Sequence, residues 1–460
     1  MSDNSSKALE VVVLAAGKGT RMYSNTPKVL HKIGGKALLA HVIQSAKDVN
    51  AKAIHVVVGF GSEQVKDCFA QEGVTWALQA EQLGTGHAVA QALPNIDPSS
   101  IVLVLYGDVP LIKQETLVKL TQRVQANAIA LLTVNSTDPT GLGRIIRNDQ
   151  GRAVAIVEEK DANATQKEIK ETNSGILAAP ANKLLSWLEA LSPKNAQGEY
   201  YLTDIISMAV NDHYCVETLT VDDELEVLGV NNKTQLAQLE RHLQKRKTDE
   251  LLSAGVTLLD PSRVDIRGSL QCGRDVEIDI NAIFEGKVVL GNNVRIGPNV
   301  VIKDSAIGDS THIYANSLIE ESTIADQCSI GPFARLRTGT HLNTAAKIGN
   351  FVETKKANIG NASKINHLSY VGDATVGSHV NIGAGTITCN YDGQNKFQTL
   401  IHNNVFIGSN SVLVAPIEIG QGSFVAAGST ITKGVGDNQL AVARARQRNI
   451  DGWKRPEKKK

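Results

Sequence analysis

A glycine-rich segment that follows the first apolar run of the chain has residue types suited to binding phosphate. It reads Leu14-Ala15-Ala16-Gly17-Lys18-Gly19-Thr20-Arg21-Met22, and Lys28 follows shortly after it. Small residues let the backbone approach a nucleotide closely, and backbone N–H groups can cradle phosphate oxygens. Arg21 and Lys28 add positive charge where a triphosphate would lie. The segment lacks the Walker A pattern, and Met22 stands where a dinucleotide fingerprint has its third glycine. A simple tight turn between a strand and a helix is therefore as good an interpretation as a phosphate-binding loop.

Two further polar segments favour nucleotide chemistry over a turn. Asp108 ends an apolar run as Tyr106-Gly107-Asp108, at the carboxyl end of a predicted strand, where open α/β sheets bind ligands. A carboxylate there can hold Mg²⁺, which takes one or two protein oxygens together with phosphate oxygens. Taken alone, Asp108 is equally consistent with a turn cap. Gln79 opens a second polar and glycine-containing loop that runs to His87.

His367 is the candidate general base of the C-terminal half. Imidazole accepts protons near neutral pH, although a lone histidine is more often an ordinary solvated side chain. Here Arg337, Lys355 and Tyr370 lie at positions that a repeating fold would place on neighbouring turns. Cations beside a base suit an anionic substrate that must lose a proton.

These residues need elements that hold them in place. Continuous apolar runs at residues 11–14, 54–58 and 101–105 predict strands that are buried on both faces of a parallel sheet. Helical patterns at 37–49 and 62–70 alternate with them. The alternation predicts an α/β three-layer domain over residues 1–232.

A polar helix is predicted over residues 233–254, with Gly255 as its stop. Its leucines recur near helical spacing, but charged residues cover the other positions. A helix this polar should not be deeply buried, and such helices often bridge domains through solvent.

Within residues 255–460, aliphatic residues recur at every sixth position in several runs between Leu290 and Ile431. This period predicts a parallel β-helix in which each aliphatic residue points inward. The segment from Cys389 to Phe397 breaks the pattern and should loop out as a candidate binding element. The repeating positions are Leu290, Ile296, Ile302, Ile324, Ile330, Leu336, Leu342, Ile348, Ile359, Ile365, Val371, Ile401, Ile407, Leu413, Ile419, Val425 and Ile431.

Composition narrows the class of protein. Lys+Arg and Asp+Glu both number 47, so the net charge suggests neither a nucleic-acid nor a membrane partner. The five scattered cysteines fit a reducing compartment, and no apolar stretch is long enough to span a bilayer. We therefore expect a cytoplasmic protein. The basic tail from Lys454 to Lys460 is interpreted as solvated, with phosphate binding as the minority alternative.

Together the motifs resemble a known family. Gly17-x-Gly19-Thr20-Arg21 with Pro27-Lys28 resembles the signature of sugar-1-phosphate nucleotidyltransferases. The whole chain resembles the bifunctional enzymes that fuse an N-acetylglucosamine-1-phosphate uridyltransferase to a glucosamine-1-phosphate N-acetyltransferase. The further segments that carry this resemblance are Gln79, Gly84-Thr85, Tyr106-Gly107-Asp108, Gly143-Arg144 and Gly229-Val230-Asn231-Asn232.

The resemblance implies a fold and a function. It implies a Rossmann-like nucleotidyltransferase domain, a linker helix at 233–254 and a left-handed β-helix acetyltransferase domain at 255–460. The left hand opposes the usual right-handed crossover preference, so physical rules alone would not give it. The implied substrates are UTP, glucosamine-1-phosphate and acetyl-CoA, with Mg²⁺ as cofactor. The implied assembly is a homotrimer, and the product, UDP-N-acetylglucosamine, feeds peptidoglycan and lipopolysaccharide precursors.

The resemblance also assigns roles to matching residues. In the N-terminal domain, Asp108 and Asn231 would bind Mg²⁺, and Arg21 and Lys28 would meet the phosphates. The UTP and UDP-sugar set is Leu14, Ala15, Ala16, Gly17, Arg21, Lys28, Gln79, Gly84, Thr85, Tyr106, Gly107, Asp108, Gly143, Glu158, Asn173 and Asn231. Of these, Gly143, Glu158 and Asn173 would hold the N-acetylglucosamine moiety.

In the C-terminal domain, the resemblance makes His367 the base that deprotonates the glucosamine amine. The N–H of Ala384 would polarise the thioester carbonyl. The set that would bind sugar phosphate and coenzyme A is Arg337, Lys355, Tyr370, Asn381, Ala384, Asn390, Tyr391, Ser409, Ala427 and Arg444.

Two other functions stay open at this point. The β-helix could only trimerise or regulate a single-activity nucleotidyltransferase, although His367, Lys355 and the Asn390-Tyr391 loop argue against a mere spacer. The chain could also be a non-catalytic regulatory assembly, but the intact Arg21 and Asp108 argue against that.

Overall fold

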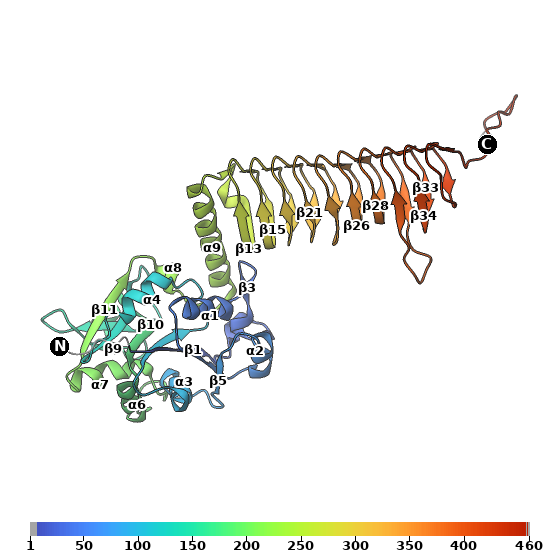
Figure 1. Cartoon of the computed structure of the whole chain (residues 1–460). Helices are drawn as coiled ribbons and strands as arrows, with labels where there is room; N and C mark the ends of the chain where they lie inside the picture. The colour runs from blue at the N-terminus through green and yellow to red at the C-terminus, as the bar shows by residue number, and fades with distance from the viewer. Residues whose placement is uncertain (1–6, 457, 459–460) are drawn as a thin grey trace. The chain divides into compact units, whose positions relative to one another are not determined.

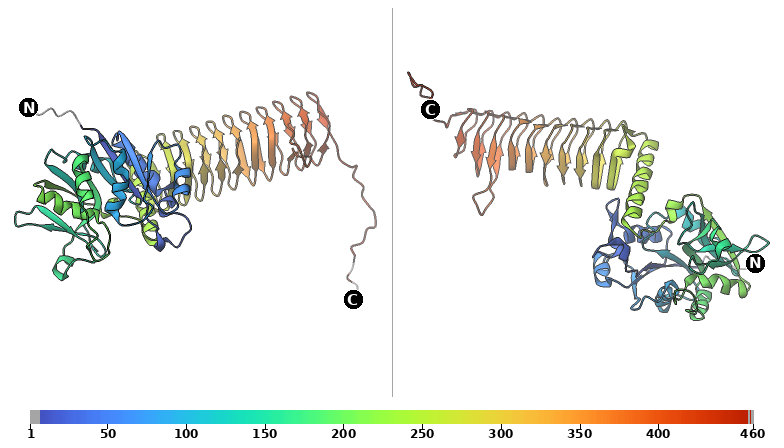
Figure 2. Two further views of the ribbon diagram at one scale, coloured as in Figure 1. Left: turned by 90° about the horizontal axis from the view of Figure 1, so that it is seen from below. Right: turned by 180° about the vertical axis from the view of Figure 1, so that it is seen from behind.

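The computed structural model describes residues 7–456 and 458 and divides into two compact units, which meet in sequence between Leu243 and Gln244. The first unit is an α/β domain, and the second is a stack of β coils (Figures 1 and 2). The N-terminal residues 1–6 and the tail residues 457, 459 and 460 lie outside the described part, whereas the rest of the basic tail is exposed. Within the described residues, no helix combines the length and apolarity that crossing a membrane requires.

The sheet of the first unit confirms the predicted strands. Its strand order is β11-β7-β10-β6-β1-β4-β5, and β10 runs antiparallel to β6 and β7, so the sheet is mixed rather than wholly parallel. The bounds are β1 Leu9–Ala15, β4 Ala53–Val58, β5 Thr75–Leu78, β6 Ile101–Tyr106, β7 Ala128–Asn135, β8 Arg144–Arg147, β9 Ala153–Val157, β10 Glu171–Pro180 and β11 Cys215–Val221.

The continuous apolar runs follow from burial on both sheet faces. On β1, Val11 and Val13 pack into one core, and Val12 and Leu14 pack into another on the opposite face. Helices α1 and α4 contribute to the first core, and α3, α6 and α7 contribute to the second. The three-layer prediction is therefore confirmed. The helix bounds are α1 Leu38–Asp48, α2 Ser62–Cys68, α3 Thr85–Ala92, α4 Gln114–Thr121, α5 Ala164–Lys167, α6 Ala181–Glu189, α7 Ile205–Asn211, α8 Glu224–Val227 and α9 Lys233–Ser253.

The expectation that α9 would avoid deep burial is wrong at several of its inner positions. Leu239 is buried against Met22 and Ile33 in a core cluster of the first unit. Within the second unit, the buried Gln244 donates its amide to the carbonyl of Ile266 at 3.1 Å and accepts from the Ile266 N–H at 2.7 Å. The polar side chain of Gln244 can be buried because it forms hydrogen bonds with the backbone of Ile266.

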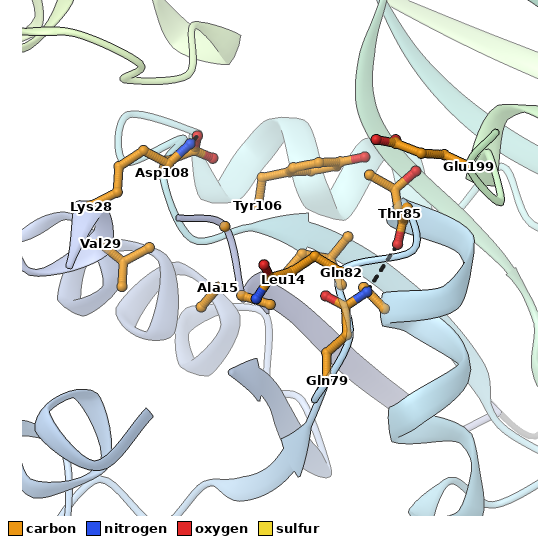
Figure 3. Close-up of a pocket in the computed structure, with 14 residues that line it drawn as sticks. Leu14, Ala15, Lys28, Val29, Gln79, Gln82, Thr85, Tyr106, Asp108 and Glu199 are labelled. Atoms are coloured by element: carbon orange, nitrogen blue, oxygen red, sulfur yellow. Dashed lines mark hydrogen bonds and ion pairs between the residues drawn. The ribbon is translucent and has the colours of Figure 1, made fainter. Parts of the chain in front are cut away.

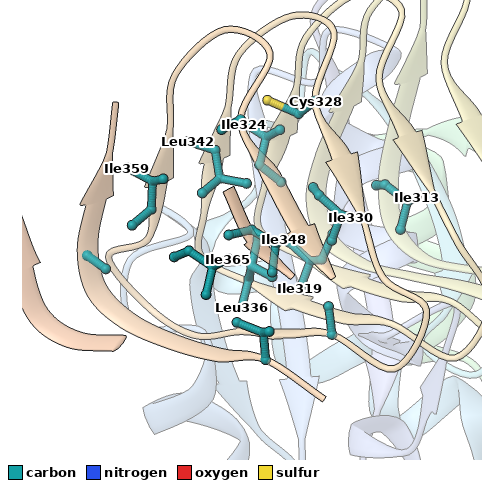
Figure 4. Close-up of a cluster of buried hydrophobic side chains, with 14 of the residues drawn as sticks. Ile313, Ile319, Ile324, Cys328, Ile330, Leu336, Leu342, Ile348, Ile359 and Ile365 are labelled. Carbon is teal, nitrogen blue, oxygen red and sulfur yellow. The ribbon is translucent and has the colours of Figure 1, made fainter. Parts of the chain in front are cut away.

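The second unit is a parallel β-helix, as the period of six predicts. Each strand pairs in parallel with the equivalent strand one coil later, so that Ile348 pairs with Ile365 and Ile365 with Ile382. All the predicted repeat positions are buried in one continuous core. Figure 4 shows part of this core. The segment after β30 (Ile387–Cys389) leaves the coil and returns at β31 (Thr399–Ile401), which confirms the predicted loop.

One corner of the coils has an unusual turn residue in three successive coils. Phe333, Phe351 and Leu368 adopt φ values of 56°, 56° and 49°. Coils before and after them use Asn316 and Gly385 at this turn, which are types that accept a left-handed backbone at low cost. The three apolar side chains are nevertheless 49%, 55% and 62% exposed. We call Phe333, Phe351 and Leu368 the corner ridge.

Candidate functional site

A cavity of about 260 Å³ lies where strands β1, β5 and β6 end, and it gathers most of the predicted nucleotide residues (Figure 3). The glycine-rich segment continues β1, Gln79 follows β5, and Tyr106 ends β6. The cavity is lined by Leu14, Ala15, Ala16, Gly17, Lys28, Val29, Gln79, Gln82, Gly84, Thr85, Ala88, Tyr106, Asp108 and Glu199.

Gln79 is fixed by its own surroundings. Its side chain is buried, and its Nε2 donates to the carbonyl of Gly84 at 3.1 Å and contacts Nδ1 of His87 at 3.2 Å. Gly84 has a φ of 116°, and a Cβ on it would lie 2.6 Å from the carbonyl oxygen of Tyr200. Only glycine fits this close approach of two chain segments, so the loop presents its backbone to the cavity.

Asp108 and Asn231 are brought together around one cation. The Nζ of Lys28 contacts Oδ2 of Asp108 and lies 3.3 Å from Oδ1 of Asn231. The backbone fixes this pairing, because the N–H of Val230 donates to the carbonyl of Asp108 at 2.9 Å. Gly229 also matters, since a Cβ there would lie 3.4 Å from Oδ2 of Asp108.

The donor set around Lys28 fits Mg²⁺. One carboxylate and one amide oxygen are the small protein share that Mg²⁺ takes when phosphate oxygens supply further ligands. No group of three or more His, Cys, Asp or Glu with metal-binding geometry occurs among the described residues. An all-protein metal cage is therefore absent from that part of the chain, and an ammonium already occupies the position between the two oxygens.

A second cavity of about 580 Å³ shares Lys28, Tyr106 and Asp108 with the first and includes Asn173. Beside it, the N–H of Asn173 donates to the carbonyl of Gly143 at 2.8 Å. The carboxylate oxygens of Glu158 lie 3.5 Å from where a Cβ on Gly143 would be. The three residues that the resemblance assigns to the sugar thus form one group.

Glu158 has a strongly perturbed environment. Burial raises the pKa of Glu158, and the nearby carboxylates of Asp204, Asp161 and Glu199 raise it further, against a lowering contribution from Thr203. The Oγ1 of Thr203 donates to Oε1 of Glu158 at 2.9 Å. Burial likewise raises the pKa of Tyr106, so its phenol stays protonated.

Four predicted residues do not line these cavities: Arg21, Gly107, Gly143 and Glu158. Arg21 is exposed in a short 3-10 helix, Thr20–Met22, and lines neither cavity. Gly107 instead links the end of β6 to β1, because its N–H donates to the carbonyl of Leu14 at 2.9 Å. Sequence reasoning missed Thr203 and Glu199, which come from segments without a recognisable motif.

The C-terminal candidates lie in a line along one corner of the coils. His367, Ala384, Ser409 and Ala427 occupy equivalent positions in successive coils. The carbonyls of the first three accept hydrogen bonds from the N–H groups of Gly385, Asn410 and Gly428 at 3.4, 2.7 and 2.8 Å. Arg444 extends the line, because its Nη1 donates to the carbonyl of Ala427 at 2.8 Å. The N–H of Ala384 makes no hydrogen bond to any described residue.

His367 is exposed and oriented by a residue that sequence reasoning missed. Its Nδ1 lies 2.7 Å from Oδ1 of Asn350, the paired residue on the preceding coil. Because an amide oxygen can only accept, the ring donates from Nδ1, and in the neutral imidazole the lone pair then lies on Nε2.

Three cations gather on the adjacent face. The N–H of Arg337 donates to the carbonyl of Thr354 at 2.9 Å, which sets Arg337 beside Lys355. The charges of Lys396 and Arg337 lower the pKa of Lys355. Arg337 is also paired with Glu353 at 2.7 Å. Lys396 comes from the ejected loop, and no pattern in the sequence singled it out.

Tyr370 shares the face of these cations, since Glu353 pairs with Tyr370 in the sheet. Asn390 is buried and donates to Asp373 on the preceding coil, whereas Tyr391 is exposed and donates to the carbonyl of Gly393. Asn381 lies apart from this group, on the neighbouring face of the coil with Phe406.

The fold and these sites define a nucleotidyltransferase domain joined to a hexapeptide-repeat transferase. The MobA-like NTP transferase domain family matches residues 11–199, the GMPPB C-terminal domain family matches 266–359, and six bacterial transferase hexapeptide repeats match 398–433. The hexapeptide match and the parallel coils agree with the left-handed β-helix that the resemblance implies.

Relatives identify the family. The bifunctional protein GlmU of Saccharophagus degradans is 58% identical over 451 residues, which is 98% of this chain and 100% of that protein. The bifunctional protein GlmU of Marinobacter nauticus is 56% identical over 450 residues, which is 98% of this chain and 99% of that protein. The chain belongs to the GlmU family of bifunctional transferases.

Proposed function

We propose that the two units catalyse consecutive steps. The second unit transfers the acetyl group of acetyl-CoA to the amine of glucosamine-1-phosphate. The first unit then transfers UMP from UTP to N-acetylglucosamine-1-phosphate and releases pyrophosphate. Family membership supports both activities, and the residues at each site suit the corresponding chemistry.

In uridyl transfer, the sugar phosphate attacks the α-phosphorus of UTP. Such a reaction depends on in-line positioning and on neutralising charge, and it needs no protein nucleophile. Gln79 and the backbone around Gly84 would hold the base and ribose, and Lys28 would move from Asp108 to the phosphates. Asp108 and Asn231 would hold Mg²⁺, whose positive charge would offset that of the phosphates.

In acetyl transfer, the amine nitrogen of glucosamine-1-phosphate forms a bond to the thioester carbonyl carbon, and the carbon–sulfur bond breaks. Nε2 of His367 takes the proton that the amine loses, and Asn350 holds the ring in the required tautomer. The unpaired N–H of Ala384 would stabilise the oxyanion. Arg337, Lys355 and Lys396 would bind the sugar phosphate, since clustered cations suit a dianion.

A homotrimer formed through the β-helix is part of this proposal. The corner ridge supports it, because exposed apolar side chains in a costly backbone conformation need a compensating contact. Coils repeat at the strand spacing of about 4.8 Å, so a second β-helix offers grooves at the same interval. The ridge adjoins His367, and a convex corner cannot enclose a substrate without a neighbouring surface.

The observation that carries the acetyltransferase assignment is an exposed His367 held by Asn350 beside three cations. His367→Ala should lower acetyl-transfer turnover by roughly 10²- to 10⁴-fold, the usual contribution of general-base catalysis. Uridyl transfer should not change. The matched control is His379→Ala, because His379 is also an exposed histidine of the coils. A turnover within about threefold of the unaltered enzyme would remove His367 from the mechanism.

A further inference from the structure

Arg144 is a buried charge that none of the steps above uses. Its side chain is only 2% exposed and ranks among the largest fully buried side chains of the described residues. Burying a guanidinium is costly, and an apolar residue of similar size is often as stable or more stable. Its Nε is buried and lacks a partner among the described residues, which adds to that cost. A residue retained at such cost calls for a role other than stability.

The contacts of Arg144 bracket the sugar group. Its Nη1 donates to the carbonyl of Leu142, and its Nη2 donates to Oε2 of Glu159 at 2.6 Å. Leu142 immediately precedes Gly143, and Glu159 immediately follows Glu158. The guanidinium therefore ties together the two backbone segments that carry these residues.

The two backbone segments lie close together. A Cβ on Gly143 would lie 2.8 Å from Cγ2 of Ile156, so the strands approach too closely for a side chain. The carbonyl of Gly143 holds Asn173 at 2.8 Å, and Glu158 is held by Thr203 at 2.9 Å. A shift of either backbone segment would move Gly143 and Glu158 relative to each other.

From these contacts we infer that Arg144 is a positioning residue that sets the spacing of the sugar subsite and thereby its affinity for N-acetylglucosamine-1-phosphate. The inference rests on the proposed uridyl transfer. Arg144 acts on the sugar side only, because the uracil and ribose side is built from Gln79, Gly84 and the end of β1, none of which it contacts. Lysine cannot replace it, since one ammonium lacks the planar fork that reaches a carbonyl and a carboxylate together.

The test compares Michaelis constants for the two substrates of uridyl transfer. Arg144→Met should raise the KM for N-acetylglucosamine-1-phosphate by about tenfold, the usual effect of leaving buried hydrogen-bond partners unpaired. The KM for UTP should stay within about twofold, and Arg144→Lys should recover only part of the loss. A merely structural residue would instead lower the amount of folded enzyme and leave both KM values unchanged.

Two further variants keep the test decisive. Arg147→Met is the matched control, because Arg147 lies on the same strand and pairs with Glu171 at 2.6 Å but is one-third exposed. If Arg144→Met does not fold, Glu159→Leu removes the hydrogen bond to Arg144 from its less buried end and should raise the same KM. Unchanged sugar KM values in folded variants of both would overturn the inference. If the unaltered enzyme itself does not use N-acetylglucosamine-1-phosphate, the proposed function fails instead.

Discussion

Replacing Phe351 with asparagine tests the proposed assembly, because it should have opposite effects on the stability of the single chain and on the association of chains. Phe351 has a φ of 56°, a region that costs a bulky residue about 1 to 2 kcal/mol. Asparagine serves at the equivalent turn in other coils, such as Asn316 and Asn410. Within a single chain, Phe351→Asn should therefore relieve strain and leave the β-helix as stable or more stable.

The assembly should respond in the opposite direction. The side chain of Phe351 is 55% exposed, and a phenylalanine buries roughly 200 Å², so about 110 Å² is left for a neighbour to cover. At about 25 cal/mol per Å², that area contributes about 2 to 3 kcal/mol to each contact. Losing it should weaken association by roughly 30- to 140-fold per contact.

Sedimentation velocity over a range of concentrations gives the assembly constant, and thermal unfolding of the dissociated chain gives the stability. The matched control is Asn410→Gly, which exchanges one turn-compatible residue for another. We expect Phe351→Asn to dissociate at concentrations where the control stays assembled. If the variant stays assembled at the same concentrations as the control, the corner ridge is not the contact, and the strain argument is refuted.

Two further predictions concern the first unit. Asp108→Asn should reduce uridyl transfer by at least about 10²-fold, because the charge of the carboxylate that would hold Mg²⁺ beside the reacting phosphates is lost, while acetyl transfer stays unchanged. Near-normal uridyl transfer would make Asp108 a turn residue. Burial raises the pKa of Glu158 above its unfolded value, so its charged form opposes folding. Its favourable contribution is present below the unfolded pKa of about 4.3 and is lost as pH rises through the folded pKa. Glu158→Gln should therefore raise the melting temperature at pH 8 but not at pH 4, and an equal shift at both pH values in calorimetry would contradict this.

The parts of the fold that could be predicted are those set by local pattern. A buried position every six residues requires no knowledge of distant contacts, so Ile401 and Ile407 could be placed inside the coil from sequence alone. The strands could be predicted for the same reason, since Val11 and Val12 face opposite cores and both must be apolar. The antiparallel β10 could not, because pairing direction depends on a chain path that local pattern does not encode.

The parts of the sites that could not be predicted depend on contacts between distant segments. Asn350 orients His367 only because they are paired across one coil, and Lys396 reaches Lys355 only because its loop folds back. The burial of Gln244 was missed because hydropathy takes no account of a side chain that bonds the backbone of another segment. Arg21 lies exposed outside both cavities, and its contact with the phosphates stays a prediction.

The hydrogen bonds of Gln244 have a consequence for the end of the β-helix. Strand β13 (Val264–Cys272) pairs with β15 (Ala282–Leu290) on one edge, and no other strand in the described chain pairs with its opposite edge. Such an edge is a template on which further strands can add. Gln244 occupies the backbone groups of Ile266, and Lys247 occupies the carbonyls of Ile266 and Gly268 at 2.8 and 3.0 Å. These side chains of α9 thus block the addition of further strands to the free edge of β13. A fragment beginning at Gly255 would lack this protection.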